Sequence, residues 1–291
     1  MRLIWRRLLA VFVVACVTTW AHESYDVLSD VDTTLAPFSL IGVALGIFLG
    51  FRNNASYDRF WEGRKLWGQI VNASRTITRQ ILVFVGPVEG GKDEREHHRA
   101  AVYRVIAYVH LLRHHLRRED DFSEVEGLLS ERELEALKVE HNRPVALLQM
   151  MGLQFRKDWE RGWIDSFHLP VLEGSLTELT GVQGGCERIK NTPIPYSYSL
   201  LLHRIVGIYC FMLPFGLVVD VGMVTPLVVL FVSYAFLGLD AIGGELEDPF
   251  GYDPNDLPLS QLTRMIEVNL RQRLGETDLP DYHQPVDNLL V

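Results

Sequence analysis

The chain has 291 residues, of which 48% are hydrophobic and 22% charged, and its formal net charge is −9. This composition excludes an intrinsically disordered chain, and a negative charge without a compensating basic block argues against a nucleic-acid-binding protein. The three cysteines, Cys16, Cys186 and Cys210, lie far apart in the sequence. We therefore predict reduced packing residues, with neither a disulfide framework nor a cysteine metal site.

Four apolar runs predict transmembrane helices. Residues 33–51 and 221–239 each contain 19 residues without a charge, close to the ~20 residues that cross a ~30 Å hydrocarbon layer. Residues 8–21 and 205–219 are shorter, and flanking segments can lengthen both. Although three arginines precede residues 8–21, the sequence after that run is a poor cleavage site, so we predict a membrane span there in preference to a signal peptide.

Basic residues flank the predicted spans on one side only. Arginines precede the first span and follow the second, whereas the connector at residues 22–34 has four acids and no Lys or Arg. By the positive-inside rule, both termini and residues 52–191 are predicted to lie in the cytoplasm.

The rest of the chain predicts further helices and no strand, so the fold class is all-α. Helical periodicity covers residues 94–120, 123–139, 144–163, 170–190 and 259–274, whereas residues 243–258 read as a loop. We divide the chain into residues 1–51 (two spans), 52–195 (a cytoplasmic helical region), 196–242 (two spans) and 243–291 (an acidic loop, a C-terminal helix and a tail).

Three local patterns outside the apolar runs lead to specific expectations. Ser123 and Glu126 have the spacing of a capping box, which would begin a helix directly after Ser123. His110 and His114 lie four residues apart, a spacing that metal ligands use, but arginines crowd them. We therefore expect a solvated basic face in preference to a metal site. His203, at the start of the third span, would pair with the acids beyond the fourth span or contact lipid headgroups.

The second apolar run continues into a charged segment with no proline or turn cluster between them, which predicts one long helix that leaves the membrane and enters the cytoplasmic region. Every fourth residue is a glycine that would allow close helix packing: Gly42, Gly46 and Gly50. The adjacent ridge is apolar: Val43, Ile47 and Phe51. This ridge would either form a narrow neck where several copies meet around an axis, or face lipid.

Three segments resemble the bestrophin family in its bacterial branch. They are residues 36–68, residues 186–204 leading into "LPFGL", and residues 246–259, in the order of the family. The resemblance implies a homopentameric ion channel in the bacterial inner membrane, with four spans per subunit and one axial pore. Its partners would be other copies of itself, membrane lipids and small monovalent ions. Animal members conduct chloride and related anions and bacterial members can conduct cations, so both stay open here.

The resemblance also assigns roles to individual residues. It places the pore neck at Val43, Ile47 and Phe51, and Val171, beside a proline, is the candidate for a second, cytoplasmic constriction. The calcium clasp of animal relatives corresponds in position to four acids: Glu245, Asp248, Asp253 and Asp256. The acidic run is shorter here, and the animal clasp takes a further ligand from a segment before the first span. We therefore expect no cofactor, with calcium as the alternative. If calcium does not bind, Asp256 is expected to cap the helix that begins near residue 258.

No nucleophile–base pair, phosphate loop or HExxH pattern occurs, so we predict that the protein is not an enzyme. The alternatives are a membrane-anchored metal-dependent enzyme that uses the acids of residues 245–256, and a membrane scaffold.

Overall fold

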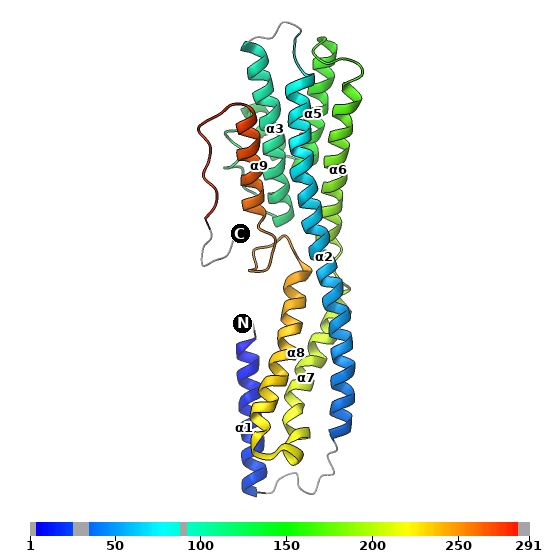
Figure 1. Ribbon diagram of the computed structural model, residues 1–291, viewed down its shortest axis with the longest axis vertical. Helices are drawn as coiled ribbons and strands as arrows, with labels where there is room; N and C mark the ends of the chain where they lie inside the picture. Colours follow the sequence, from blue (N-terminus) through cyan, green and yellow to red (C-terminus); the bar gives the residue numbers. More distant parts are fainter. Residues whose placement is uncertain (1–3, 26–34, 88–91, 285–291) are drawn as a thin grey trace. The chain divides into compact units, whose positions relative to one another are not determined.

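The structure is a computed structural model that describes residues 4–25, 35–87 and 92–284. The described residues contain helices and no strand, which confirms the all-α prediction (Figure 1). The elements are α1 (Trp5–Tyr25), α2 (Leu35–Phe84), α3 (Lys92–Arg117), α4 (Glu131–Lys138), α5 (Arg143–Glu160), α6 (Leu169–Asn191), α7 (Tyr196–Val221), the 3-10 turn η1 (Gly222–Val224), α8 (Thr225–Glu247) and α9 (Leu259–Arg273). Arg2, most of the acidic connector and the end of the predicted tail lie outside the described residues.

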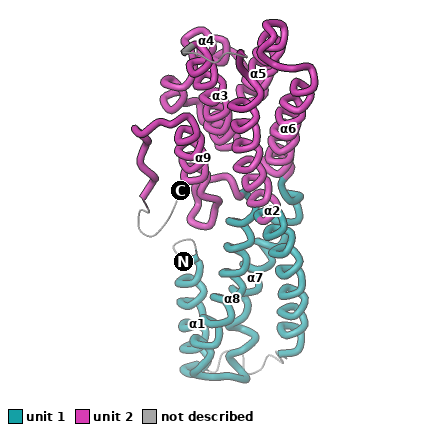
Figure 2. Tube along the Cα trace, turned by 45° about the horizontal axis from the view of Figure 1, so that its top comes forward, with its two compact units in different colours: residues 1–60, 193–248 teal, residues 61–192, 249–291 magenta. Residues whose placement is uncertain are grey.

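The chain divides into two compact units (Figure 2). Unit 1 contains residues 1–60 and 193–248, and unit 2 contains residues 61–192 and 249–291. The 50-residue helix α2 contributes its first half to unit 1 and its second half to unit 2. The functional division predicted at residues 51, 195 and 242 stays a prediction.

Unit 1 is a bundle of apolar helices. Helices α1, α7 and α8 pack against one another, and Leu45 and Leu49 of α2 join their buried core. Three helical stretches are long and apolar enough to cross a membrane: Trp5–Tyr25, Leu35–Phe84 and Tyr196–Glu247. The last of these contains both α7 and α8, which reverse direction through η1. Gly222 makes this reversal possible because its φ of +58° lies in the left-handed region that favours glycine.

Unit 2 is built around α3, which packs against α5, α6 and α9. The predicted apolar stripe of α3 is buried as expected: Val102, Ile106, Val109, Leu112 and Leu116. The second half of α2 buries its own stripe at steps of three, seven and four residues, at Trp67, Ile70, Ile77 and Ile81. Each unit thus has its own core, and α2 supplies residues to both.

Two predicted boundaries were wrong. Ser123 does not cap a helix, because its backbone N–H and hydroxyl both donate to the carboxylate of Asp121 in a turn. The capping box lies instead at Ser130 and Glu133, and α4 begins at Glu131. Likewise, the predicted loop at residues 243–258 begins later, because α8 continues to Glu247.

Candidate pore-lining site

The first half of α2 has one buried face and one exposed apolar face. Leu45 and Leu49 are buried against the unit 1 core, at 4% and 0% exposure. The predicted ridge is exposed: Val43 is 64%, Ile47 54% and Phe51 64% accessible in the single chain. At about 100° of rotation per residue, this ridge points roughly opposite to the buried face. The apolar ridge is therefore available to a partner other than the chain's own helices.

The three glycines of the predicted packing motif have different surroundings. A Cβ at Gly42 would lie 2.6 Å from the Tyr209 hydroxyl of α7, so a larger residue there would displace the Tyr209 side chain. At Gly46 and Gly50, an added Cβ would meet no atom within 4 Å in the described part of the chain. Only Gly42 of the three therefore takes part in close packing inside one subunit, and the predicted packing role of the other two stays a prediction.

Arg52, the residue after the ridge, points into the subunit. Its guanidinium Nη1 lies 2.6 Å from Asp240 Oδ1 of α8, and both side chains are buried, at 6% and 4% exposure. His203 Nδ1 of α7 lies 2.6 Å from the other oxygen of the same carboxylate. Asp240 therefore joins α2, α7 and α8, and it neutralises the positive charge nearest the ridge.

Gly243 of α8 leaves room for the polar side chains at this junction. A Cβ at Gly243 would overlap the Asn53 amide oxygen, so a larger residue there would force the Asn53 side chain to move. At Gly244 an added Cβ would lie 3.6 Å from the Arg52 Nη2, which is ordinary van der Waals contact. Sequence reasoning paired His203 with acids beyond the last span, whereas its partner Asp240 lies inside α8.

The candidate for a second constriction lies at the start of α6. Val171 is 44% exposed in the first turn of that helix. Phe167, four residues earlier, is 85% exposed, and its backbone N–H donates to the Asp165 carboxylate at 2.8 Å. Both side chains are exposed, and the role of Val171 as a second constriction stays a prediction.

The four acids considered for calcium do not form a described site. Glu245 and Asp248 belong to unit 1 and Asp253 and Asp256 to unit 2. Within the described ranges, no group of three or more His, Cys, Asp or Glu side chains is arranged to hold a metal ion. Asp256 does not cap α9 either; its carboxylate accepts the backbone N–H of Asp253 at 2.8 Å and closes a turn. Whether calcium binds these acids stays a prediction.

His110 and His114 of α3 are buried, so the predicted solvated basic face was wrong. His110, Arg113 and His114 are 1%, 5% and 2% exposed. His114 Nε2 lies 2.8 Å from Glu124, which also pairs with Arg113, and His110 Nε2 lies 3.1 Å from Glu267 of α9. The sequence could not reveal these partners because they lie 10 to 157 positions away. The cluster ties α3 to α9 and to the turn at Glu124.

The sequence of the chain matches a known family and several curated proteins. Residues 1–272 match the family described as Bacterial/Fungal Bestrophin protein. A voltage-dependent anion channel-forming protein of Ralstonia nicotianae is 41% identical over 275 residues, which is 94% of this chain and 88% of the relative. A protein of the same description from Salmonella typhi is 42% identical and covers 85% of this chain and 79% of its own length.

Solved structures show the same similarity in three dimensions. A bacterial bestrophin homologue from Klebsiella pneumoniae superposes with a TM-score of 0.86 at 38% identity and covers 94% of this chain and 99% of its own. A second crystal structure, described as that of a membrane protein, gives a TM-score of 0.88 at 38% identity, with coverage of 95% and 100%.

Proposed function

This chain belongs to the bacterial and fungal bestrophin family, and from this membership we propose that it is a membrane ion channel in which five copies enclose one axial pore. Relatives at about 40% identity are named as channel-forming proteins. The proposed protomer has four spans, α1, the first half of α2, α7 and α8, in the bacterial inner membrane. Both of its termini are on the cytoplasmic side.

The exposed apolar ridge of α2 is the single observation that carries this proposal. Val43, Ile47 and Phe51 repeat every four residues on the face opposite the subunit core. In a closed ring, five such ridges would line a narrow neck whose apolar walls hinder ion passage by excluding water. No bound cofactor is needed for such passive transport, and the relatives are named as channels, which gives the enzyme and scaffold alternatives no support.

The buried ion pair beside the ridge supports a proposal about charge selectivity. Arg52 directly follows Phe51, and its pairing with Asp240 compensates the positive charge that would otherwise lie next to the neck. A dry neck without its own charge discriminates weakly between small monovalent anions and cations. We therefore propose that the neck gates flow and that charges elsewhere choose the ion.

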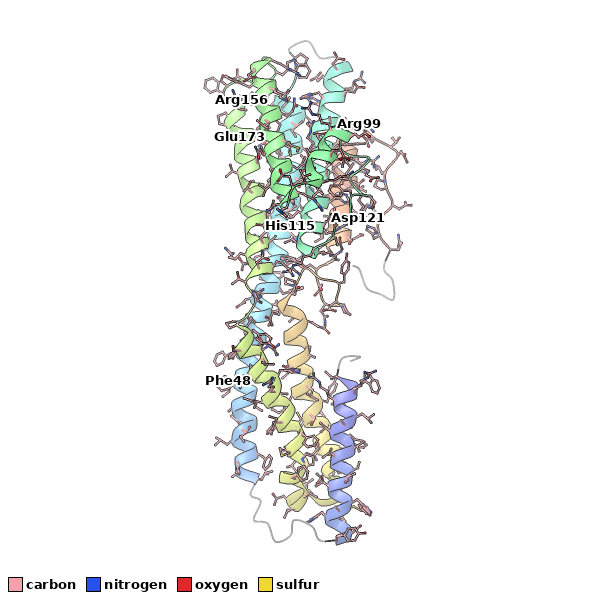
Figure 3. All side chains as sticks on the ribbon, turned by 180° about the vertical axis from the view of Figure 1, so that it is seen from behind. Phe48, Arg99, His115, Asp121, Arg156 and Glu173 are labelled. Carbon is pink, nitrogen blue, oxygen red and sulfur yellow. The ribbon has the colours of Figure 1, made fainter. Side chains whose placement is uncertain are left out.

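Recordings from single channels in planar bilayers test the neck. Ile47→Ala and Phe51→Ala should each raise the conductance, by roughly threefold or more, because a wider neck admits water. Phe48→Ala is the matched control: Phe48 (labelled in Figure 3) lies on the same helix, is 49% exposed and, as the next residue after Ile47, stands about 100° around the helix from it. Its conductance should stay at the wild-type value.

Equal conductance in wild type, Ile47→Ala and Phe51→Ala would show that the ridge does not line the pore. The same recordings also locate the second constriction. If Val171 narrows the pathway, Val171→Ala changes ion permeability ratios and Phe167→Ala does not; the reverse result would assign that role to Phe167.

A further inference from the structure

Unit 2 contains a pocket with an unusual concentration of positive charge. The second half of α2 and the end of α9 enclose a cavity of about 420 Å³. Arg75 and Arg79 line it from α2, and Arg273 lines it from α9. No acidic side chain among the described residues lines this cavity, although the whole chain carries a net charge of −9. A basic pocket in an acidic protein is a local feature that general surface charge does not explain.

The three arginines have no acidic partner in the part of the chain that the structure describes. Arg75 donates from Nη2 to the side-chain oxygen of Asn269 at 2.6 Å, a neutral acceptor that orients the guanidinium without cancelling its charge. Neither Arg79 nor Arg273 has an ion pair or hydrogen bond among the described residues. Three like charges around one small volume repel one another, and a bound anion would relieve that repulsion.

A neighbouring cavity gives the contrast. It has a volume of about 530 Å³ and shares Leu82 and Arg273 with the first pocket. There two of the arginines pair with an acid: Arg99 lies 3.2 Å from Glu276, and Arg271 lies 2.6 Å from the same carboxylate (Arg99 is labelled in Figure 3). Acidic side chains thus line the second cavity beside its arginines, whereas none lines the first among the described residues.

The remaining walls of the pocket define the rest of the ligand. Leu82 and Val83 of α2 and Leu270 of α9 provide an apolar side, and Val83 is 65% exposed. Arginine binds phosphate oxygens through two parallel N–H donors, a geometry that a lysine ammonium lacks. A volume of about 420 Å³ falls within the range of small-molecule sites, which is roughly 300–1,000 Å³.

From this arrangement we propose that the pocket of Arg75, Arg79 and Arg273 binds an organic phosphate, with the phosphate held by the arginines and an apolar substituent against Leu82 and Val83. A soluble phosphate ester and the headgroup of an anionic phospholipid share this chemistry. The three arginines belong to unit 2 and the proposed neck residues to unit 1, and the proposal does not depend on ion conduction.

Ligand binding to the full-length protein in neutral detergent tests the proposal. Inorganic phosphate and phenyl phosphate should each raise the thermal unfolding temperature in a saturable manner, with phenyl phosphate binding more tightly because its ring contacts the apolar side. Arg79→Gln combined with Arg273→Gln should weaken binding at least tenfold. Arg132→Gln, which removes an exposed arginine of α4 outside the pocket, should bind as wild type does.

Two further variants separate the parts of the site. Val83→Ala should weaken phenyl phosphate and leave inorganic phosphate unchanged, whereas Arg79→Lys combined with Arg273→Lys should retain part of the phosphate affinity. Adding phosphatidylglycerol to phosphatidylcholine micelles decides the source. If phosphatidylglycerol competes with phenyl phosphate, the natural ligand is a lipid headgroup. If phosphatidylglycerol does not compete, the natural ligand is a soluble ester.

Equal stabilisation of wild type and the double glutamine variant by phosphate would overturn the proposal. So would a wild type that does not respond to either phosphate. If the double variant instead dissociated the oligomer and phosphate did not affect wild type, the arginines would be contacts between copies. None of these results bears on the conductance measurements, so failure here leaves the proposed channel untouched.

Discussion

Glu124 shows how much a single carboxylate can organise in unit 2. It lies among Arg113, His114 and His110, at 2.8 Å from His114 Nε2 and 3.8 Å from His110 Nδ1. Burial alone would raise the pKa of Glu124, but the surrounding His110, His114 and Arg113 hold that pKa well below its usual range. Burial would also raise the pKa of Glu267 on α9, but the hydrogen bond and charge of His110 lower it.

These lowered pKa values predict acid-sensitive stability. A carboxylate with a lower pKa in the folded than in the unfolded state stabilises the fold fully above the unfolded pKa of about 4.5. That stabilisation is lost as the pH falls below this value. Glu124→Gln should therefore lower the free energy of unfolding by about 2–3 kcal/mol at pH 7 and reduce the loss of stability between pH 5 and pH 3.

Tryptophan fluorescence during thermal unfolding in detergent, at pH values from 3 to 8, measures this effect. Glu126→Gln is the matched control, because Glu126 is exposed in the same turn and outside the cluster. A Glu124→Gln protein with the wild-type dependence on pH would show that the cluster does not contribute to acid sensitivity.

The acids beyond α8 lead to a second prediction for single residues. Asp256 closes a turn with the N–H of Asp253, and the described residues offer no three-ligand metal group. We expect ion flux into liposomes to be the same with millimolar calcium and with a chelator. A calcium response that Asp253→Asn abolishes would contradict this expectation and restore the clasp.

At the scale of single residues, the sequence predicted chemical type better than environment. The apolar ridge of Val43, Ile47 and Phe51 follows from helical spacing alone, because four-residue steps share one helix face. The burial of His110 could not be predicted, since it depends on Glu267, 157 positions away in the sequence. Spacing along a helix was predictable, whereas partners far away in the sequence were not.

The Asp240 carboxylate of α8 connects α2 with α7 and α8 through ion pairs. Asp240 of α8 binds both Arg52 of α2, at 2.6 Å, and His203 of α7, at 2.6 Å. The sequence predicted α2 as one continuous helix because no helix-breaking residue interrupts it, and the structure confirms this over Leu35–Phe84. It did not predict the junction, because an acid within an apolar span gives no information on which of three helices it will meet.

Asp240→Asn should have two separable effects. Removing one partner of a buried ion pair leaves Arg52 uncompensated, which costs about 3–5 kcal/mol of stability. In the channel, the uncompensated guanidinium next to Phe51 should also shift the reversal potential under a potassium chloride gradient toward the chloride equilibrium potential. Unfolding in detergent and bilayer recordings measure the two effects.

The double variant Arg52→Gln with Asp240→Asn is the control for the effects on stability and on the reversal potential. It removes the two charges together, so most of the lost stability should return and the reversal potential should match that of wild type. Should the single and double variants have the same reversal potential, Arg52 would have no influence on the choice of ion.

For the whole molecule, one chain exposes a large apolar surface that either lipid or another copy of the chain would cover. The large apolar side chains of the α2 ridge are exposed on the face opposite the core, as are Trp20 and Val17 of α1. Lipid can cover some of this surface. The same ridge on several copies can also be buried around an axis. A repeated contact of this kind buries the ridge of every copy when the copies close into a ring.

Cross-linking between copies distinguishes these two environments. With Cys16, Cys186 and Cys210 replaced by alanine, Ile47→Cys would carry the single thiol of each chain. Near an axis, these thiols can approach within the ~4 Å between Cβ atoms that a disulfide requires. Oxidation should therefore give covalent dimers in high yield, whereas Trp20→Cys, 59% exposed on α1, should give almost none.

Native mass spectrometry of the same unoxidised protein in mild detergent should show an assembly of five chains of 33.2 kDa, about 166 kDa in total. Disulfide-linked dimers inside that assembly would place the ridges opposite one another around a common axis. A monomeric species, together with equal cross-linking yields at Ile47→Cys and Trp20→Cys, would mean that the ridge faces lipid. In that case the apolar face of α2 would be an anchor in the membrane, and the pathway for ions would have to lie elsewhere.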